Sequence, residues 1–317
     1  MKRLAVVVPC YNEEAVLPET SHRLIELLTN LVAEKLISSN SYVLLVDNGS
    51  FDKTWELIKK YHADSQYIKG ISLSINAGHQ GGLLAGLSTV VNQSDMTITI
   101  DADLQDDVNA IREMVIQFNE GYDVVYGVRS SRKSDSFMKR FTAQSFYKLM
   151  NRMGAKSVYN HADYRLLSQR AVKYLLQFKE KNLYLRGIVP LLGYNSTCVY
   201  YERAERFAGE SKYPISKLFS FAFEGITSFS VKPVHMVFWL GTIFMFVSLC
   251  AMVWVVYALA FGIYVQGWAS MMISIWFCSG CVLMGLGIVG EYIGKIYLEV
   301  KDRPRFNITD ILMDNNE

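Results

Sequence analysis

The sequence predicts an α/β domain with a doubly wound, mostly parallel sheet, followed by a hairpin of two membrane-spanning helices. Two observations support this fold class. Short β-rich runs alternate with segments long enough for crossover helices over residues 1 to about 130. The chain is also 51% hydrophobic and only 20% charged, which is more apolar than a soluble domain needs. That excess lies near the C-terminal end, so it indicates membrane segments and not a larger core.

Five β-rich runs define the expected sheet. They are RLAVVVP, SYVLLVD, GISLSI, MTITID and YDVVYG, beginning at Arg3, Ser41, Gly70, Met96 and Tyr122. The helices expected between them cover residues 13–37, 52–62, 80–91 and 108–120. No GxGxxG directly follows a strand, and neither GxxxxGKS nor GxxxxGKT occurs. Neither a dinucleotide site nor a P-loop is therefore predicted.

Two uncharged apolar runs follow, Val234–Val265 and Trp268–Val289. Each is long enough to cross a bilayer, which takes roughly 20 residues. Lysine and arginine flank the pair but are absent from its short connection, so both ends are expected to face the cytoplasm. Gly290 and Gly294 form a GxxxG pattern that would allow close helix packing, either between the two helices of the hairpin or in a homo-oligomer. The expected domains are 1–230 (cytoplasmic, with interfacial helices), 231–298 (hairpin) and 299–317 (cytoplasmic tail).

The net charge of +2 gives no indication of nucleic-acid binding. The stretch TITIDADLQDD, Thr97–Asp107, places a buried strand directly before a cluster of carboxylates and a glutamine. In an open α/β sheet, ligands bind where the strands end. An acidic turn that caps a following helix at Asp106 or Asp107 explains the stretch equally well when it is considered alone.

Four motifs in order resemble glycosyltransferase family 2 with its GT-A fold: VVVPCYNEE at 6–14, VDNGSFDKT at 46–54, NAGHQGGLLAGL at 76–87 and DADLQDD at 101–107. The likeness continues through GVRSSR, DYRLLSQRAV and the stretch ERFAGESKYPISKLF to the apolar tail. This combination is similar to the polyprenyl-phosphate glycosyltransferases, relatives of dolichol-phosphate mannose synthase, and especially to the bacterial bactoprenol glucosyltransferases.

The resemblance implies an inverting, multi-pass enzyme of the bacterial cytoplasmic membrane. It would move a hexose, first of all glucose from UDP-glucose, onto undecaprenyl phosphate at the cytoplasmic face, for cell-surface glycan modification such as that of O-antigen or teichoic acid. UDP-N-acetylglucosamine or another nucleotide sugar is an alternative donor. A processive polysaccharide synthase would carry a QxxRW motif, which is absent. A non-catalytic scaffold is disfavoured by the intact Asp101, Asp103 and Gln105.

The resemblance also implies roles for single residues. Those expected to bind the nucleotide sugar are Pro9, Tyr11, Glu13, Asp47, Asp101 and Ala102. Asn48 stands where many relatives have a second aspartate. Asp103 and Gln105 are the expected ligands of Mg²⁺ or Mn²⁺, which prefer oxygen donors. The expected catalytic residues are Asp101, Asp103, Arg129 and Asp163, the last as an orienting group or a base.

Basic residues after the acidic loop predict the acceptor end of the site. Arg129 and Arg132, between the expected catalytic strand and the next amphipathic segment, are expected to hold the lipid phosphate. The resemblance to the family adds Arg206, Ser211 and Lys212 as further candidates. Two amphipathic segments, 136–153 and 214–232, fit helices that lie on an anionic membrane surface. Ordinary amphipathic helices packed on the sheet would have the same pattern.

Overall fold

The structure is a computed structural model of the whole chain. It describes residues 1–130, 161–180, 185–202 and 267–313, together with separate positions between 237 and 261. The chain divides into two compact units. The first comprises Met1–Asn151, Lys156–Pro214 and Arg303–Glu317, and the second comprises Arg152–Ala155 and Ile215–Asp302.

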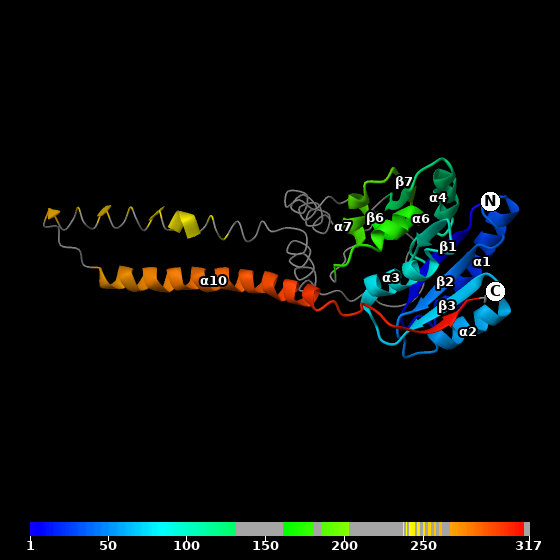
Figure 1. The fold of residues 1–317 in the computed structure, drawn as a ribbon, viewed down its shortest axis with the longest axis horizontal. Helices are drawn as coiled ribbons and strands as arrows, with labels where there is room; N and C mark the ends of the chain where they lie inside the picture. Colours follow the sequence, from blue (N-terminus) through cyan, green and yellow to red (C-terminus); the bar gives the residue numbers. More distant parts are fainter. Residues whose placement is uncertain are drawn as a thin grey trace. The chain divides into compact units, whose positions relative to one another are not determined.

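The first unit contains an eight-stranded sheet with the strand order β7-β5-β6-β4-β1-β2-β3-β8 (Figure 1). The strands are β1 (Leu4–Cys10), β2 (Tyr42–Asp47), β3 (Ile68–Leu73), β4 (Met96–Thr99), β5 (Val124–Arg129), β6 (His161–Ser168), β7 (Ser196–Tyr201) and β8 (Ile308–Leu312). Only β6 and β8 run antiparallel to their neighbours. The predicted mostly parallel α/β sheet is therefore confirmed.

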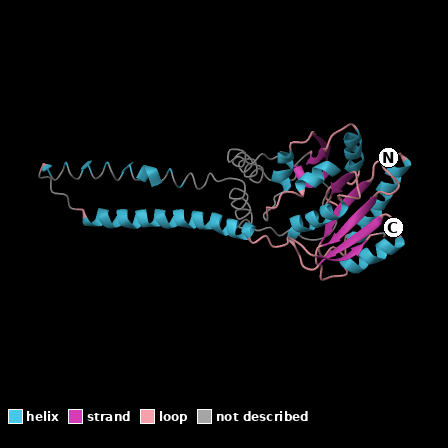
Figure 2. Cartoon of the chain, viewed as in Figure 1, coloured by secondary structure: helices cyan, strands magenta, loops and turns pink. Residues whose placement is uncertain are grey.

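Helices cover both faces of this sheet (Figure 2). They are α1 (Leu17–Ala33), α2 (Thr54–Asp64), α3 (Gly78–Val90), α4 (Ala110–Asn119), α6 (Gln169–Leu175) and α7 (Leu185–Ile188), with a 3₁₀ turn η1 (Val189–Leu192). Because side chains alternate along a strand, Val6 and Val8 of β1 join the core cluster with α1 and α4, whereas Val7 joins the cluster with α3. The four helices predicted between strands correspond to α1 to α4.

Close packing of α3 on the sheet depends on Gly86. A Cβ at this position would lie 2.3 Å from Cγ1 of Val7 and 3.0 Å from Cγ2 of Val46. Glycine therefore lets the helix approach β1 and β2 more closely than any other residue would. This approach brings the first residues of α3 to the edge where β1 and β2 end.

The second unit contains α10 (Trp268–Val300). Among the described helices, one segment, Phe277–Val300, is long and apolar enough to cross a membrane. Its mean hydropathy is 1.5, and none of its most apolar window is buried inside the protein. Most of the first predicted span lies outside the described residues, so the two-helix hairpin stays a prediction. The predicted amphipathic segments 136–153 and 214–232 also lie outside them.

Candidate active site

The candidate site lies at the edge of the sheet where the parallel strands end. Strands β1 to β4 run in the same direction, and so do β5 and β7. Because β6 is antiparallel to both β4 and β5, its beginning lies at this same edge. The residues that the topology gathers there are Asp47, the loop Asp101–Asp107, Arg129, Asp163 and Tyr201.

The loop after β4 exposes alternate residues. Leu104 has a φ of 56°, a left-handed conformation that is uncommon for a residue other than glycine. Leu104 and Asp106 are buried, whereas Asp101, Asp103 and Gln105 stay partly exposed. The carboxylate of Asp103 accepts the N–H of Gln105 at 3.2 Å. Asp107 is partly exposed as well, so the loop presents four oxygen-bearing side chains on its partly exposed positions.

These side chains fit a divalent cation. Burial, followed by the charges of neighbouring carboxylates that include Asp163, Asp106 and Asp103, raises the pKa of Asp101 to about 6, against an opposing effect of His79. A cation would neutralise this concentration of negative charge, and oxygen donors suit Mg²⁺ or Mn²⁺. No group of three His, Cys, Asp or Glu side chains among the described residues is placed to hold a metal by itself.

His79 is a site residue that sequence reasoning missed, although it lies within the quoted NAGHQGG motif. Its Nε2 lies 3.6 Å from Oδ1 of Asp101 and 3.5 Å from Oδ2 of Asp163. Burial alone would lower the pKa of His79, but the hydrogen bond to Asp163 and the charges of both aspartates outweigh it and raise this pKa. The imidazole therefore bridges two of the predicted catalytic carboxylates.

Asp163 is buried among positive charges. Arg186 donates to its Oδ2 through Nε at 3.0 Å and Nη2 at 2.9 Å, and Arg165 pairs with its Oδ1. Burial alone would raise the pKa of Asp163, but the hydrogen bond from His79 and the two guanidinium charges hold it far below its usual range. A carboxylate this acidic is a poor base. The geometry favours the orienting role over the basic one.

Arg129 is held by the same loop that carries the expected metal ligands. Its Nη2 donates to Oδ1 of the buried Asp106 at 3.0 Å, and the hydroxyl of Tyr201 donates to this oxygen at 2.6 Å. Of the two residues expected as alternatives for a capping turn, Asp107 and not Asp106 makes the bond before the helix. The N–H of Asn109 bonds to Asp107 at 2.9 Å, directly before α4.

The predicted nucleotide residue Asp47 ends β2 and is only 3% exposed. Its Oδ1 accepts the N–H of Ser50 at 3.1 Å, and its Oδ2 accepts the hydroxyl of Ser72 at 2.9 Å. Gly49, which follows in the same turn, has a φ of 70°, and a Cβ there would lie 2.6 Å from the backbone carbon of Ile75. This turn therefore requires glycine.

Asn48, which stands in place of the family's second aspartate, connects two loops. Its Oδ1 accepts the N–H of Ala77 at 2.9 Å, and its Nδ2 donates to the carbonyl of Gly78 at 3.0 Å. An aspartate could accept the first bond but could not donate the second. The asparagine thus fixes the turn that leads directly into His79.

The other expected nucleotide residues lie at the ends of β1 and β4. Tyr11 is 39% exposed, and its ring makes an edge contact with the 89% exposed Phe51 at a centroid distance of 6.5 Å. Pro9 and Glu13 are partly buried. Ala102 is buried, and its carbonyl accepts the hydroxyl of Thr20 at 2.8 Å.

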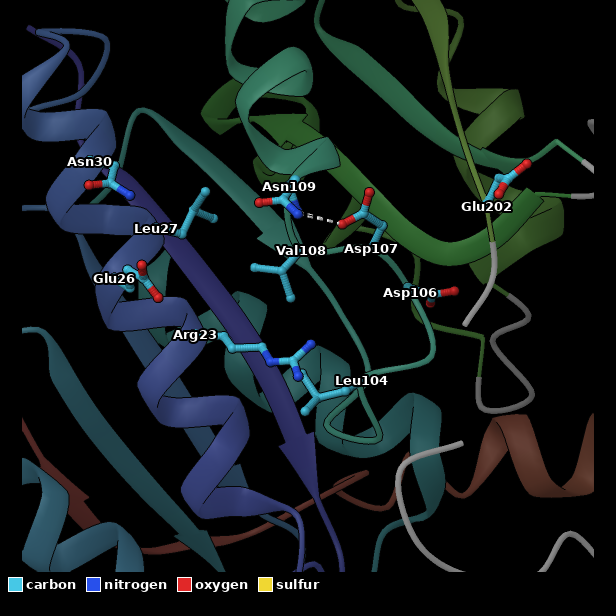
Figure 3. A pocket seen from close by; sticks show the side chains of 10 residues that line it. All are labelled: Arg23, Glu26, Leu27, Asn30, Leu104, Asp106, Asp107, Val108, Asn109 and Glu202. Atoms are coloured by element: carbon cyan, nitrogen blue, oxygen red, sulfur yellow. Dashed lines mark hydrogen bonds between the residues drawn. The ribbon is translucent and has the colours of Figure 1, made fainter. Parts of the chain in front are cut away.

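A cavity of about 540 Å³ lies between α1 and the acidic loop (Figure 3). Its lining residues are Arg23, Glu26, Leu27, Asn30, Leu104, Asp106, Asp107, Val108, Asn109 and Glu202. Leu104 and Asp106 line it, but Asp101 and Asp103 do not. The cavity thus borders the loop away from Asp101 and Asp103. Four residues expected to hold a lipid phosphate lie outside the described residues: Arg132, Arg206, Ser211 and Lys212.

Comparison with known proteins gives consistent matches. The model of the family described as glycosyl transferase family 2 matches residues 5–176. A Bacillus subtilis protein named uncharacterized glycosyltransferase YkoT is 51% identical, covering 99% of this chain and 93% of its own. The bactoprenol glucosyl transferase of Shigella phage SfX is 36% identical, covering 96% and 98%. A solved glucosyl-3-phosphoglycerate synthase from Mycobacterium tuberculosis is 18% identical, covering 71% and 78%, with a TM-score of 0.43.

Proposed function

The chain belongs to glycosyltransferase family 2, and we propose that it transfers a hexose from a nucleotide sugar, first of all UDP-glucose, to polyprenyl phosphate at the cytoplasmic face of a bacterial membrane. One observation carries the proposal. The likeness to the Shigella phage SfX bactoprenol glucosyl transferase covers 96% of this chain and therefore extends well beyond the family domain at 5–176. The lipid-linked sugar would then serve the modification of a cell-surface glycan.

The donor end of the proposed site runs from Asp47 to the acidic loop. Asp47, Tyr11 and the neighbouring backbone would bind the nucleotide. Asp103 and Gln105 would hold Mg²⁺ or Mn²⁺ against the diphosphate. Such an ion neutralises the charge that develops on the departing diphosphate. Asp101, which His79 contacts at 3.6 Å, would lie nearer the nucleotide.

The acceptor end is proposed at Arg129. A phosphate monoester is mostly dianionic near neutral pH, because its second pKa is about 6, so it needs positioning more than deprotonation. Arg129 is held by Asp106 and keeps 23% of its side chain exposed. A phosphate oxygen there would attack the anomeric carbon as the nucleoside diphosphate leaves from the opposite side, which inverts the configuration. The acidity of Asp163 agrees with a reaction that needs no base.

A membrane location is supported by the apolar helix and by the path of the chain. Val237 and Phe244, in the first predicted span, approach Gly285 and Phe277 of α10. The earlier residue of one segment meets the later residue of the other, as in an antiparallel hairpin. At the sheet, Glu202 and the beginning of β8 both lie at the site edge. The proposed arrangement is a catalytic domain with a two-helix membrane anchor.

The test is an assay of purified full-length protein in detergent with undecaprenyl phosphate, Mg²⁺ and a panel of labelled nucleotide sugars. Label is expected in the organic extract with UDP-glucose, or with another hexose donor such as UDP-N-acetylglucosamine. Transfer to a water-soluble acceptor, with no label in the lipid fraction for any donor, would overturn the proposal. A long polymeric product would indicate a processive synthase.

A further inference from the structure

The strand β8 is the edge strand of the sheet and lies beside β3, although it follows the apolar helix α10 in the sequence (Figure 1). The two strands pair antiparallel, from Gly70 opposite Leu312 to Leu73 opposite Ile308. Phe306, just before the strand, packs on the core cluster beneath α3. The sequence predicts a tail over residues 299–317, whereas the structure has a strand at Ile308–Leu312. The sheet is thus completed by residues that lie beyond the membrane segment.

The pairing of β8 with β3 contains a bulge near the candidate site. The register shifts between Ser72 and Leu73, so that Thr309 is skipped. The hydroxyl of Thr309 donates to the carbonyl of Ser72 at 3.1 Å, and the N–H of Ser74 donates to the carbonyl of Asn307 at 3.0 Å. Bulges at sheet edges often redirect a side chain beside an active site. Here β8 and the residue before it bond to the backbone of Ser72 and of Ser74.

Ser72 transmits this constraint to Asp47. The two residues are partners in the parallel pairing of β2 with β3, and the hydroxyl of Ser72 donates to Oδ2 of Asp47 at 2.9 Å. The other oxygen of Asp47 accepts the N–H of Ser50 at 3.1 Å. The orientation of this buried carboxylate is therefore set by one bond from its own turn and one bond from a strand that β8 holds.

We infer that β8 is a positioning strand for the donor end of the site, with Ser72 and Thr309 as positioning residues for Asp47. The inference rests on the proposed function, in which Asp47 contacts the nucleotide. It has a direct consequence for the architecture of the protein. A catalytic domain cut before α10 would lack a strand that orients its donor site, although it would keep every motif of the family.

The test compares full-length variants in detergent, using calorimetry with UDP and UDP-glucose. Ser72→Ala is expected to weaken nucleotide binding about three- to tenfold, the range for one lost hydrogen bond. Ser72→Thr keeps the hydroxyl and should bind as the wild type does. Thr309→Val should weaken nucleotide binding by about twofold, because the lost hydrogen bond to Ser72 lies on an exposed strand. Thr309→Ser keeps the hydroxyl and should bind the nucleotide as the wild type does. The KM for polyprenyl phosphate and the kcat at saturating donor should change little in all four.

Ser94→Ala is the matched control. Ser94 is also buried, and its hydroxyl donates to the carbonyl of Val90 at 2.9 Å, just before β4 begins and so at the opposite edge of the sheet. Ser94→Ala should lower the melting temperature as Ser72→Ala does, but it should leave nucleotide affinity unchanged. Equal affinity losses in both variants would show a general stability effect and overturn the inference.

Asp47→Asn separates failure of the inference from failure of the proposed function. If Asp47→Asn weakens nucleotide binding but Ser72→Ala does not, β8 does not position the donor site, and the proposed function stands. If the wild type binds neither UDP nor UDP-glucose, or if Asp47→Asn binds them as tightly as the wild type, the assigned donor site is wrong and the inference falls with it.

Discussion

Asp106→Asn should impair use of the lipid acceptor while leaving the donor bound. Asp106 is buried, and its Oδ1 accepts bonds from Arg129 at 3.0 Å and from Tyr201 at 2.6 Å. Asparagine keeps the shape but removes the charge opposite the guanidinium. A hydrogen bond to a charged group contributes about 1.5–3 kcal/mol. Since 1.4 kcal/mol corresponds to a factor of ten, kcat/KM for polyprenyl phosphate should fall on the order of ten- to a hundredfold.

The measurement is acceptor kinetics in detergent, with donor affinity from calorimetry. Asp123→Asn is the matched control, because Asp123 is equally buried, pairs with Arg170 and accepts the hydroxyl of Ser168 at 2.8 Å. It lies just before β5, whereas Arg129 ends that strand. Both variants should lower the melting temperature, and only Asp106→Asn should change acceptor kinetics. Unchanged acceptor kinetics in Asp106→Asn, or a main loss in donor affinity, would refute the reasoning.

Four further outcomes are expected. Arg129→Ala should lower kcat/KM for polyprenyl phosphate about ten- to a hundredfold and leave donor affinity nearly intact. Arg129→Lys should keep only part of the wild-type kcat/KM, because lysine lacks the bidentate guanidinium. Loss of donor binding in Arg129→Ala would contradict this assignment. Turnover should stop after exhaustive chelation and return with Mg²⁺ or Mn²⁺, and full turnover without metal would contradict the oxygen ligand set. A cysteine placed at Gln266 should react with a membrane-impermeant reagent only from the extracytoplasmic side; labelling only from the cytoplasm would reverse the topology. The pKa of His79 is raised in the folded protein, so the contacts of protonated His79 stabilise the fold fully below its unfolded pKa of about 6.5 and are lost as the pH rises through the folded pKa. His79→Asn should therefore lower the melting temperature more at pH 6 than at pH 9. An equal loss at both pH values would count against the contacts of His79 with Asp101 and Asp163.

The parallel sheet could be predicted because its first two strands are nearly continuous apolar runs. In Tyr42–Asp47 all six residues are buried, as expected for a strand covered on both faces. Helix starts were less predictable. The expected helix at 13–37 begins only at Leu17, because residues 11–16 form the turn that carries Tyr11 and Glu13 at the site edge. Helix propensity alone could not predict that these residues form a turn before the helix.

The site was predictable where a motif carries the residue and unpredictable where a partner comes from a distant strand. The carboxylates of the acidic loop follow directly from the sequence. The pairing of Asp106 with Tyr201 spans 95 positions, and no local pattern indicates it. The strand β8 was missed for a related reason: its five residues, ITDIL, do not alternate between apolar and polar, and its pairing with β3 depends on a partner far away in the chain.

The alternation within the acidic loop explains how one short segment can serve both ends of the proposed reaction. Its partly exposed positions, Asp103 and Gln105, carry the expected ligands of the donor diphosphate. Its buried position Asp106 holds Arg129, the expected ligand of the acceptor phosphate. The left-handed residue Leu104 lies between Asp103 and Gln105, two residues before this buried position. A displacement of the loop would therefore move donor and acceptor groups together, so the geometry of in-line attack depends on a single backbone conformation.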